Sequence, residues 1–290
     1  MTTEIDILAE HPCFSLDRPN NKGRIHLPVS PGCNIECKFC ERKINATEQR
    51  PGITSQVISP EEALEVVRKS LALAPEISVA GIAGPGEALA TPYALETFRL
   101  IGGEFPRLIK CMSTNGLLLD DLADEVIDAG VNTLTVTINE VYPEAQALIC
   151  GRIHYKGKAY EGTEAAGLLI SRQLAGIRKI KAAGITIKVN TVLVPGINES
   201  HIADIAKAVR EAGADLYNII PLIPRFEMSN TPSPSCSQID KARTEAEKHI
   251  RVFRHCQHCR ADAVGVPGGK DYGDQIYLNR ASHSGTFSHG

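Results

Sequence analysis

The chain has 290 residues, of which 43% are hydrophobic and 22% charged, the composition of a globular protein with one large or two small domains. Its 31 Lys and Arg residues against 34 Asp and Glu give a net charge of −3, which argues against the strongly basic surface of a nucleic-acid-binding protein. The N-terminus is acidic where a secretion signal is basic, and no apolar run reaches membrane-spanning length, so we expect a cytoplasmic protein without a membrane partner.

Six short apolar runs predict buried parallel strands, and helical patterns lie between them. We expect strands at residues 24–29, 77–83, 108–114, 133–139, 186–194 and 216–223. We expect helices at residues 59–74, 93–103, 118–130, 162–184 and 200–214, the first opened by a capping box of Ser59 and Glu62. This alternation predicts an α/β fold, either an incomplete β/α barrel or a doubly wound sheet. In both folds, functional residues gather at the carboxyl ends of the strands.

Two stretches break the alternation. Residues 142–163 are expected to form a lid or substrate loop, and residues 225–238, rich in turn formers, a linker to a last helix at 238–255. The expected organisation is an N-terminal segment (1–22), a barrel domain (23–224), a C-terminal extension (225–269) and a polar tail (270–290) that carries no fold.

The most informative pattern is the CxxxCxxC spacing of Cys33, Cys37 and Cys40, directly after the first predicted strand. With nine cysteines in 290 residues, chance produces this spacing only about 0.01 times per such chain. A structural zinc site normally has four ligands in paired spacings, which this loop lacks. Three thiolates can hold three irons of a four-iron cluster, and the fourth iron then needs a distant ligand or a bound molecule.

Glycines, one carboxylate and several neutral polar residues follow the next predicted strands. They are Gly84 and Glu87 in AGPGEAL, and Ser113, Thr114, Asn115, Asn139 and Asn190. Glycines let a ligand approach the backbone, and hydroxyl and amide groups suit ribose and carboxylate oxygens. Asn115 with Gly116 fits a turn equally well, and Asn139 fits a helix cap, so each residue taken singly leaves both functions open.

The cysteine loop, with Phe39 before its third cysteine, resembles the radical S-adenosylmethionine superfamily. The resemblance implies an incomplete (β/α)6 TIM-like barrel with N- and C-terminal cluster-binding extensions. It also implies that a [4Fe-4S] cluster on Cys33, Cys37 and Cys40 binds S-adenosylmethionine through its open iron and cleaves it to a deoxyadenosyl radical. The residues implied to bind that cofactor are Phe39, Gly84, Glu87, Ser113, Thr114, Asn115, Asn139 and Asn190.

A more specific resemblance, to the NifB family, covers residues 11–265. It is carried by HPC at 11–13, RIHLPV at 24–29, AGPGEAL at 83–89, KVNTVLVPGIN at 188–198 and CQHCRADAVG at 256–265. It implies an enzyme of nitrogenase cofactor assembly that fuses two [4Fe-4S] clusters, with methyl transfer, hydrogen abstraction, carbide insertion and added sulfur, into an [8Fe-9S-C] precursor. It further implies three [4Fe-4S] clusters in all, a cluster donor, an electron donor and a cofactor carrier as partners.

The same resemblance implies the ligands of the two substrate clusters. Cys13, His26 and Cys111 would bind one, and the CxxC pair Cys256 and Cys259 the other. From the residues alone, His26 also fits a hydrogen-bonded core histidine, Cys111 a small buried residue, and the CxxC a redox dithiol. His255, His258 and Arg260 flank the pair and could stabilise thiolates.

One stretch departs from the family pattern. Residues 41–52 (ERKINATEQRPG) contain no cysteine, where many family members carry one, so Glu41 and Glu48 are candidate oxygen ligands instead. Cys150 and Cys236 match no motif and are expected to be structural. Two other functions stay open: a radical enzyme with an auxiliary cluster acting on an organic substrate, and a non-catalytic iron-sulfur scaffold.

Overall fold

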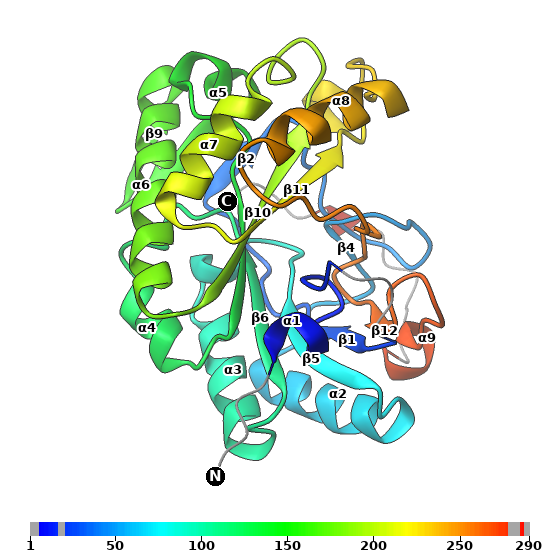
Figure 1. The fold of residues 1–290 in the computed structure, drawn as a ribbon. Coiled ribbons are helices and arrows are strands. Elements are labelled where there is room, and N and C mark those ends of the chain that lie inside the picture. Colours follow the sequence, from blue (N-terminus) through cyan, green and yellow to red (C-terminus); the bar gives the residue numbers. More distant parts are fainter. Residues whose placement is uncertain (1–5, 17–20, 278–284, 287–290) are drawn as a thin grey trace.

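The part of the chain that the structure describes, residues 6–16, 21–277 and 285–286, is built around a curled seven-stranded sheet (Figure 1). In this computed structural model, six parallel strands follow one another across the sheet in chain order. They are β1 (Gly23–His26), β5 (Ile77–Ile82), β6 (Ile109–Thr114), β7 (Thr133–Thr137), β10 (Thr186–Leu193) and β11 (Leu216–Pro221). A doubly wound sheet reverses its strand order and this one does not, so the prediction of an incomplete six-stranded β/α barrel is confirmed.

Helices cover the outer face of the sheet between the strands (Figure 1). They are α2 (Pro60–Leu73), α3 (Tyr93–Glu104), α4 (Ala123–Asp128), α6 (Gly162–Ala182), α7 (Ile202–Ala212) and α8 (Cys236–Glu247). α2 begins at the predicted capping box, in which Ser59 Oγ accepts from the Glu62 amide at 3.2 Å and Glu62 Oε2 accepts from the Ser59 amide at 2.8 Å. α8 ends earlier than the predicted helix at 238–255.

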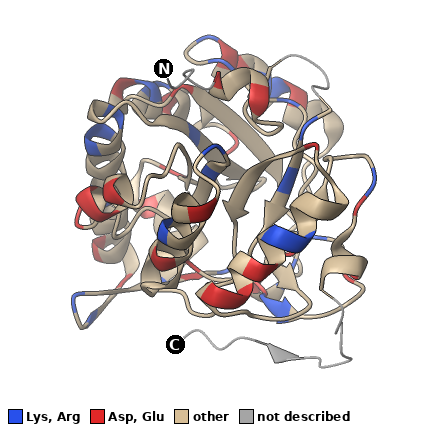
Figure 2. Cartoon of the chain, turned by 90° about the horizontal axis from the view of Figure 1, so that it is seen from below, with Lys and Arg blue, Asp and Glu red and all other residues tan. Residues whose placement is uncertain are grey.

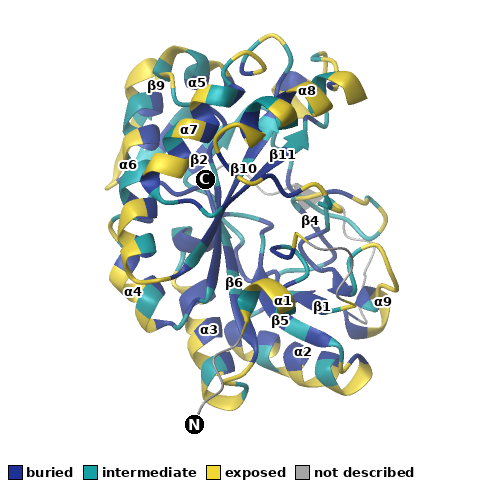
Figure 3. Cartoon of the chain, viewed as in Figure 1, coloured by how far each residue is buried: buried dark blue, intermediate teal, exposed yellow. Residues whose placement is uncertain are grey.

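The core lies between the sheet and these helices (Figure 3). Strand residues such as Ile25, Val136 and Val189 are fully buried and belong to one apolar cluster with Ile205 and Val209 of α7. Figure 2 shows basic and acidic residues interspersed over the outside, which agrees with the small net charge of −3. No helix in the described part of the chain is both long and apolar enough to cross a membrane.

Residues 142–163 are not the lid or substrate loop that the sequence predicted. They form α5 (Pro143–Ile149) and a hairpin of β8 (Cys150–Tyr155) and β9 (Lys158–Glu161) before entering α6. The hairpin turn at Lys156 and Gly157 has positive φ at both positions, as a two-residue type I′ turn requires. β8 pairs antiparallel with β2 (Ile35–Cys37), so the hairpin supports the cysteine loop.

The C-terminal extension packs against the free side of β1. Its strand β12 (Val264–Gly265) pairs antiparallel with β1, and α9 (Gly273–Ile276) follows. Tyr277 is buried and its hydroxyl donates to the carbonyl of His26, so the fold continues past residue 270, where the polar tail was expected. Residues 278–284 and 287–290 lie outside the described part. The remaining short elements are α1 (Ile7–Glu10), β3 (Lys43–Ile44), β4 (Ile53–Thr54), η1 (Ala88–Ala90), η2 (Phe226–Met228) and β13 (Gly285–Thr286).

A buried ion pair ties the CxxC segment to the loop after the cysteine triplet. Arg260 donates to both carboxylate oxygens of Asp262, at 2.7 and 2.9 Å, and to the carbonyls of Asn45 and Glu48. Asp262 also accepts from the amide of Ser55 at 2.6 Å. Burial acts to raise the pKa of Asp262, but these hydrogen bonds and the Arg260 charge hold it below its usual value. Arg260 therefore faces this carboxylate and not the CxxC thiols that the sequence suggested it would stabilise.

We expect the Asp262→Ala variant to be less stable by about 3 to 5 kcal/mol, because it leaves the Arg260 charge buried without its partner. Anaerobic urea unfolding of the variant and the parent protein measures the difference. Asp240→Ala is the matched control: its ion pairs with Arg243 and Arg254 lie at the surface, with the carboxylate side chain 69% exposed, and its loss should cost about 0 to 1 kcal/mol. Equal stability of the two variants would contradict a locking role for the buried pair.

Candidate functional site

Among the residues that the structure describes, two cavities adjoin inside the curled sheet and at its carboxyl edge. The first, about 190 Å³, is lined by Cys33, Cys37 and Cys40 and is called here the triplet cavity. The second, about 340 Å³, is lined by Cys13, His26, Cys111, Cys256 and Cys259 and is called the barrel cavity. Both are lined by Phe39, Cys40, Ala83, Ser113 and Thr137, so they share a wall.

The three triplet thiols are presented by a loop that α5 and the hairpin hold on both sides. The Lys38 amide donates to the Ile149 carbonyl at 2.9 Å, and the His154 amide donates to the Asn34 carbonyl at 2.8 Å. A turn closed by the Cys40 amide on the Cys37 carbonyl at 2.9 Å brings these two residues together. All nine cysteines of the chain are free of disulfides.

Burial keeps these thiols protonated until a metal replaces the proton. It raises the pKa of Cys33 to about 12 and also raises that of Cys40. Three soft sulfur ligands on one cavity wall, beside a polar wall of backbone and amide groups, fit a [4Fe-4S] cluster with one iron open to a ligand. Among the described residues, no three His, Cys, Asp or Glu side chains converge closely enough to hold a single metal ion.

The glycine-rich loop after β5 lies directly against the cysteine loop. The Gly86 amide donates to the Ser30 carbonyl and the Glu87 amide to the Gly32 carbonyl, both at 2.7 Å. A Cβ on Gly86 would lie 2.0 Å from the Gly32 oxygen, so only glycine permits this approach. The loop thereby brings Gly84 and Glu87 to the triplet cavity, as the sequence predicted for a binding site.

The Glu87 carboxylate is largely engaged by the protein. It is buried and accepts hydrogen bonds from the Asn115 amide at 2.6 Å, the Leu89 amide at 3.0 Å and the Thr114 hydroxyl. Burial raises its pKa, and the three hydrogen bonds oppose that rise. Because a carboxylate has about four acceptor positions, roughly one is left for a ligand ammonium.

The three asparagines predicted to bind cofactor take different positions. Asn115 lines the triplet cavity while forming the alternative turn, since its Oδ1 accepts from the Leu117 amide at 2.9 Å and its Nδ2 lies 3.8 Å from Cys33 Sγ. Asn139 also lines this cavity and does not cap a helix: its Oδ1 accepts from the Val192 amide at 2.9 Å. Asn190 lines the barrel cavity instead, where its Oδ1 accepts from Asn218 at 3.1 Å.

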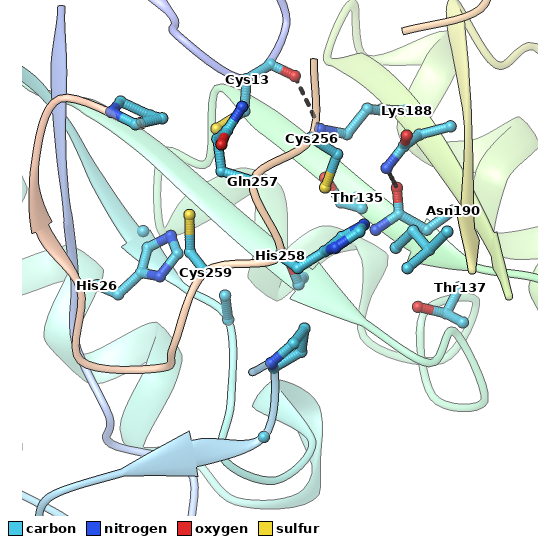
Figure 4. A pocket seen from close by; sticks show the side chains of 18 of the residues that line it. Cys13, His26, Thr135, Thr137, Lys188, Asn190, Cys256, Gln257, His258 and Cys259 are labelled. Atoms are coloured by element: carbon cyan, nitrogen blue, oxygen red, sulfur yellow. Dashed lines mark hydrogen bonds between the residues drawn. The ribbon is translucent and has the colours of Figure 1, made fainter. Parts of the chain in front are cut away.

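The barrel cavity brings together residues that lie far apart in the sequence (Figure 4). Cys13 comes from the N-terminal segment, His26 from β1, Cys111 from β6, and Cys256 and Cys259 from the C-terminal extension. Burial raises the pKa of Cys13 to about 12, with smaller contributions from the neighbouring thiols of Cys259 and Cys111. The two ligand sets predicted from the sequence therefore face one shared space.

His26 is held in the form that can bind a metal. Its Nδ1 lies 2.7 Å from the Arg260 carbonyl, an acceptor, so the ring proton sits on Nδ1 and the lone pair on Nε2. Burial lowers the pKa of His26 to about 4, assisted by the Arg24 charge, and the imidazole is therefore neutral near pH 7. This hydrogen bond also accommodates the alternative of a satisfied core histidine.

Two buried cations on strands of the sheet, both of which line the barrel cavity, escaped the sequence prediction. Arg24 Nη2 donates to Cys259 Sγ at 3.1 Å, and its Nη1 donates to the Gly265 carbonyl at 2.6 Å. Lys188 donates to the Cys13 carbonyl at 2.8 Å and lies 4.5 Å from the centre of the Phe14 ring. Strand alternation places Arg24 on the same face as His26, and Lys188 on the same face as Asn190, which is the signal that could have identified them.

The two carboxylates suggested as replacement ligands are both in ion pairs. Glu41 lines the barrel cavity, but its carboxylate lies 2.7 Å from Lys43 and 3.3 Å from Arg50, and the hydrogen bond from Lys43 lowers its pKa. Glu48 accepts from Arg50 Nε at 2.8 Å and does not line either cavity. His255 and His258 do line the barrel cavity beside the CxxC pair.

Comparison with known proteins defines the class of this site. A family model described as the radical SAM superfamily matches residues 27–209. The crystal structure of a radical SAM methyltransferase from Sphaerobacter thermophilus is similar to this fold with a TM-score of 0.57 and 17% identity, over 80% of this chain and 65% of that one. Streptococcus suis SuiB bound to S-adenosylmethionine also has a TM-score of 0.57, with 11% identity over 79% of this chain and 49% of its own. The family match defines a radical S-adenosylmethionine protein, and the structures agree with it in fold.

Sequence similarity over about nine-tenths of the chain is more specific. The FeMo cofactor biosynthesis protein NifB of Methanocaldococcus infernus is 45% identical over 262 residues, 90% of this chain and 86% of that protein. Its namesakes from Chlorobaculum tepidum and Klebsiella pneumoniae are 42% and 41% identical over 90% and 91% of this chain, which covers 62% and 58% of their lengths. The chain belongs to the NifB family, and the resemblance found in the sequence motifs is confirmed.

Proposed function

We propose that this protein builds the iron-sulfur-carbide precursor of the nitrogenase iron-molybdenum cofactor. It fuses two [4Fe-4S] substrate clusters, together with a carbon from the methyl group of S-adenosylmethionine and one added sulfur, into an [8Fe-9S-C] cluster. The observation that carries the proposal is that Cys13, His26, Cys111, Cys256 and Cys259 line one cavity, which shares a wall with the triplet cavity. The names of the relatives, FeMo cofactor biosynthesis proteins, support the same product.

In this proposal the triplet cavity holds the catalytic machinery. Cys33, Cys37 and Cys40 bind the resident [4Fe-4S] cluster, called here the radical cluster. S-adenosylmethionine lies against Phe39, Gly84, Glu87, Ser113, Thr114, Asn115 and Asn139, and Asn190 reaches it from the barrel cavity. Together, the bound cluster and cofactor supply a methyl group and a deoxyadenosyl radical. The chain itself fixes the Asn115 loop through Glu87.

The barrel cavity holds the two substrates. Cys13, His26 and Cys111 bind one [4Fe-4S] cluster, and Cys256 and Cys259 bind the other. Two thiolates leave the second cluster incompletely ligated by protein, which suits a substrate that has to move and fuse. Arg24 and Lys188 offset part of the negative charge that thiolates and sulfides bring into this buried space.

The protein acts in the cytoplasm, in this proposal, with partners that match the chemistry. A cluster donor supplies the two substrates, an electron donor reduces the radical cluster, and a carrier accepts the product. Methyl transfer, hydrogen abstraction and carbide insertion then make it an enzyme of mixed transferase and lyase type.

The test is anaerobic reconstitution followed by iron counting and isotope tracing. We expect roughly twelve irons per chain, three clusters of four, and transfer of label from the methyl group of S-adenosylmethionine into a larger cluster. The isolated product should activate a cofactor-deficient nitrogenase. Four irons and no labelled cluster would refute the proposal. Absence of S-adenosylmethionine cleavage would indicate a scaffold, and cleavage that depends on an added organic compound would indicate a different radical enzyme.

A further inference from the structure

Cys150, which matches no motif in the sequence, is the cross-strand neighbour of Cys37. The two residues are paired in the antiparallel ladder of β8 and β2, at a position where the register shifts between Glu36 and Cys37. Directly paired residues in an antiparallel ladder have Cβ atoms about 4.5 to 5.5 Å apart, within reach for a sulfur-sulfur contact. The hairpin therefore places a fourth thiol beside the cysteine loop.

The environment of Cys150 is dry and well packed. Its side chain is 1% exposed and lies in a small apolar cluster with Ile35, Ile153 and Leu169, against which Cys37 packs. Cys37 therefore lies beside Cys150, and contact between the two thiols raises the pKa of Cys37 and lowers that of Cys150. Cys150 Sγ also lies 3.5 Å from the Arg152 carbonyl oxygen, a second acceptor for its proton.

We propose that Cys150 is a positioning residue for the radical cluster, donating an S–H···S hydrogen bond to the thiolate of Cys37. The inference rests on the proposed role of Cys37 as an iron ligand. Once Cys37 binds iron it has lost its proton and acts only as an acceptor, so the proton between the two sulfurs belongs to Cys150. A charged acceptor makes a hydrogen bond roughly twice as strong as a neutral carbonyl does, so Cys150 donates to the Cys37 thiolate and not to the Arg152 carbonyl.

Such a bond has a defined electrochemical consequence. Hydrogen bonds to the cysteine sulfurs are among the factors that set the reduction potential of an iron-sulfur cluster. A donor withdraws electron density from the thiolate and stabilises the form with more negative charge, so it raises the potential. The low dielectric around Cys150 strengthens the effect because no water competes for the sulfur. Cys150 thus makes the radical cluster easier to reduce.

The test compares Cys150→Ala with Cys150→Ser in the reconstituted protein. Serine retains a donor and alanine does not. A redox titration followed by electron paramagnetic resonance gives the potential, and the radical cluster is recognised as the signal that changes when S-adenosylmethionine is added. We expect the alanine variant to titrate at a lower potential than the parent and the serine variant to restore most of the difference. Cys236→Ala, at the exposed start of α8, is the control without effect.

Several outcomes would overturn the proposal. They are an unchanged potential in the alanine variant, an equal shift in the alanine and serine variants, or loss of the radical cluster from both. Loss of the cluster from the alanine variant alone, with recovery in serine, supports the hydrogen bond. The measurement reports on the radical cluster itself. It therefore tests the role of Cys150 even if no carbide is found in a larger cluster, the result that would contradict the proposed function.

Discussion

We expect the Cys40→Ala variant to form no 5′-deoxyadenosine from S-adenosylmethionine under anaerobic reduction. The residue supplies one of three thiols in the triplet cavity, and its removal leaves the radical cluster with two protein ligands. Removing a residue that only supports a metal ligand typically lowers activity by about 10- to 100-fold. The rate of cofactor cleavage in Cys40→Ala should fall by more than this. Chromatography of the reaction mixture measures the product.

Cys236→Ala is the matched control for this experiment, since it also removes one cysteine thiol, but from an exposed site at the start of α8. It should cleave the cofactor at the parent rate. A Cys40→Ala protein that retains a tenth or more of the parent rate would exclude Cys40 as an essential iron ligand. Single replacements of Cys33 and Cys37 should behave like that of Cys40.

The parallel strands could be predicted because their signal is local. A run such as residues 133–139, apolar and bounded by turns, predicts a buried strand from its own residues, and neighbouring parallel strands end at the same edge of the sheet. From that rule alone, Ser113 and Asn139 were placed beside the cysteine triplet, and both line the triplet cavity. The turn at Asn115 could be predicted for the same reason, because the side chain of Asn115 itself accepts the hydrogen bond that forms the turn.

The supporting hairpin could not be predicted because its partner is remote. Ile35 pairs with Ile153, more than a hundred residues away, and nothing in the short segment Ile35–Cys37 marks it as a strand. Without that pairing, residues 142–163 look like an irregular break in the alternation of strands and helices, and Cys150 like a cysteine without a function. Pairing between distant segments is decided by packing of the whole chain and not by local preference.

Buried cations were missed for a different reason. Arg24 and Lys188 are charged residues within apolar runs, and charged side chains are seldom buried unless they are paired. Their partners, Cys259 and the Cys13 carbonyl, lie 235 and 175 residues away in the chain. Strand alternation relates Arg24 to His26 and Lys188 to Asn190, but only the folded chain shows that these two strand faces meet Cys13 and Cys259 in one cavity.

The shared wall between the cavities bears on the order of events in the proposed reaction. Phe39, Ser113 and Thr137 separate the space predicted for S-adenosylmethionine from the space predicted for the substrate clusters. A radical formed in the triplet cavity would therefore lie across this wall from the substrate clusters of the proposed reaction. In the proposed reaction, the substrate clusters would have to occupy the barrel cavity before a radical is formed beside it.

That separation predicts a second large effect, in which cluster assembly is lost and cofactor cleavage is not. We expect the Cys259→Ala protein to hold about eight irons in place of about twelve, one four-iron cluster fewer, and to place no methyl-derived carbon in a larger cluster. It should still form 5′-deoxyadenosine under reduction, within about twofold of the parent rate, because Cys259 lines only the barrel cavity.

Iron analysis, isotope tracing and chromatography on one sample of Cys259→Ala distinguish these effects. Cys256→Ala is the companion variant, since the two thiols are proposed to bind the same substrate cluster, and the pair should lose no more iron together than either loses alone. If Cys259→Ala abolished cofactor cleavage as completely as Cys40→Ala, the two cavities would not have separate roles. The Arg24 contact makes the alternative testable: were Cys259 only a structural partner of that guanidinium, its replacement by Ser, which keeps an acceptor for Arg24, would retain all twelve or so irons.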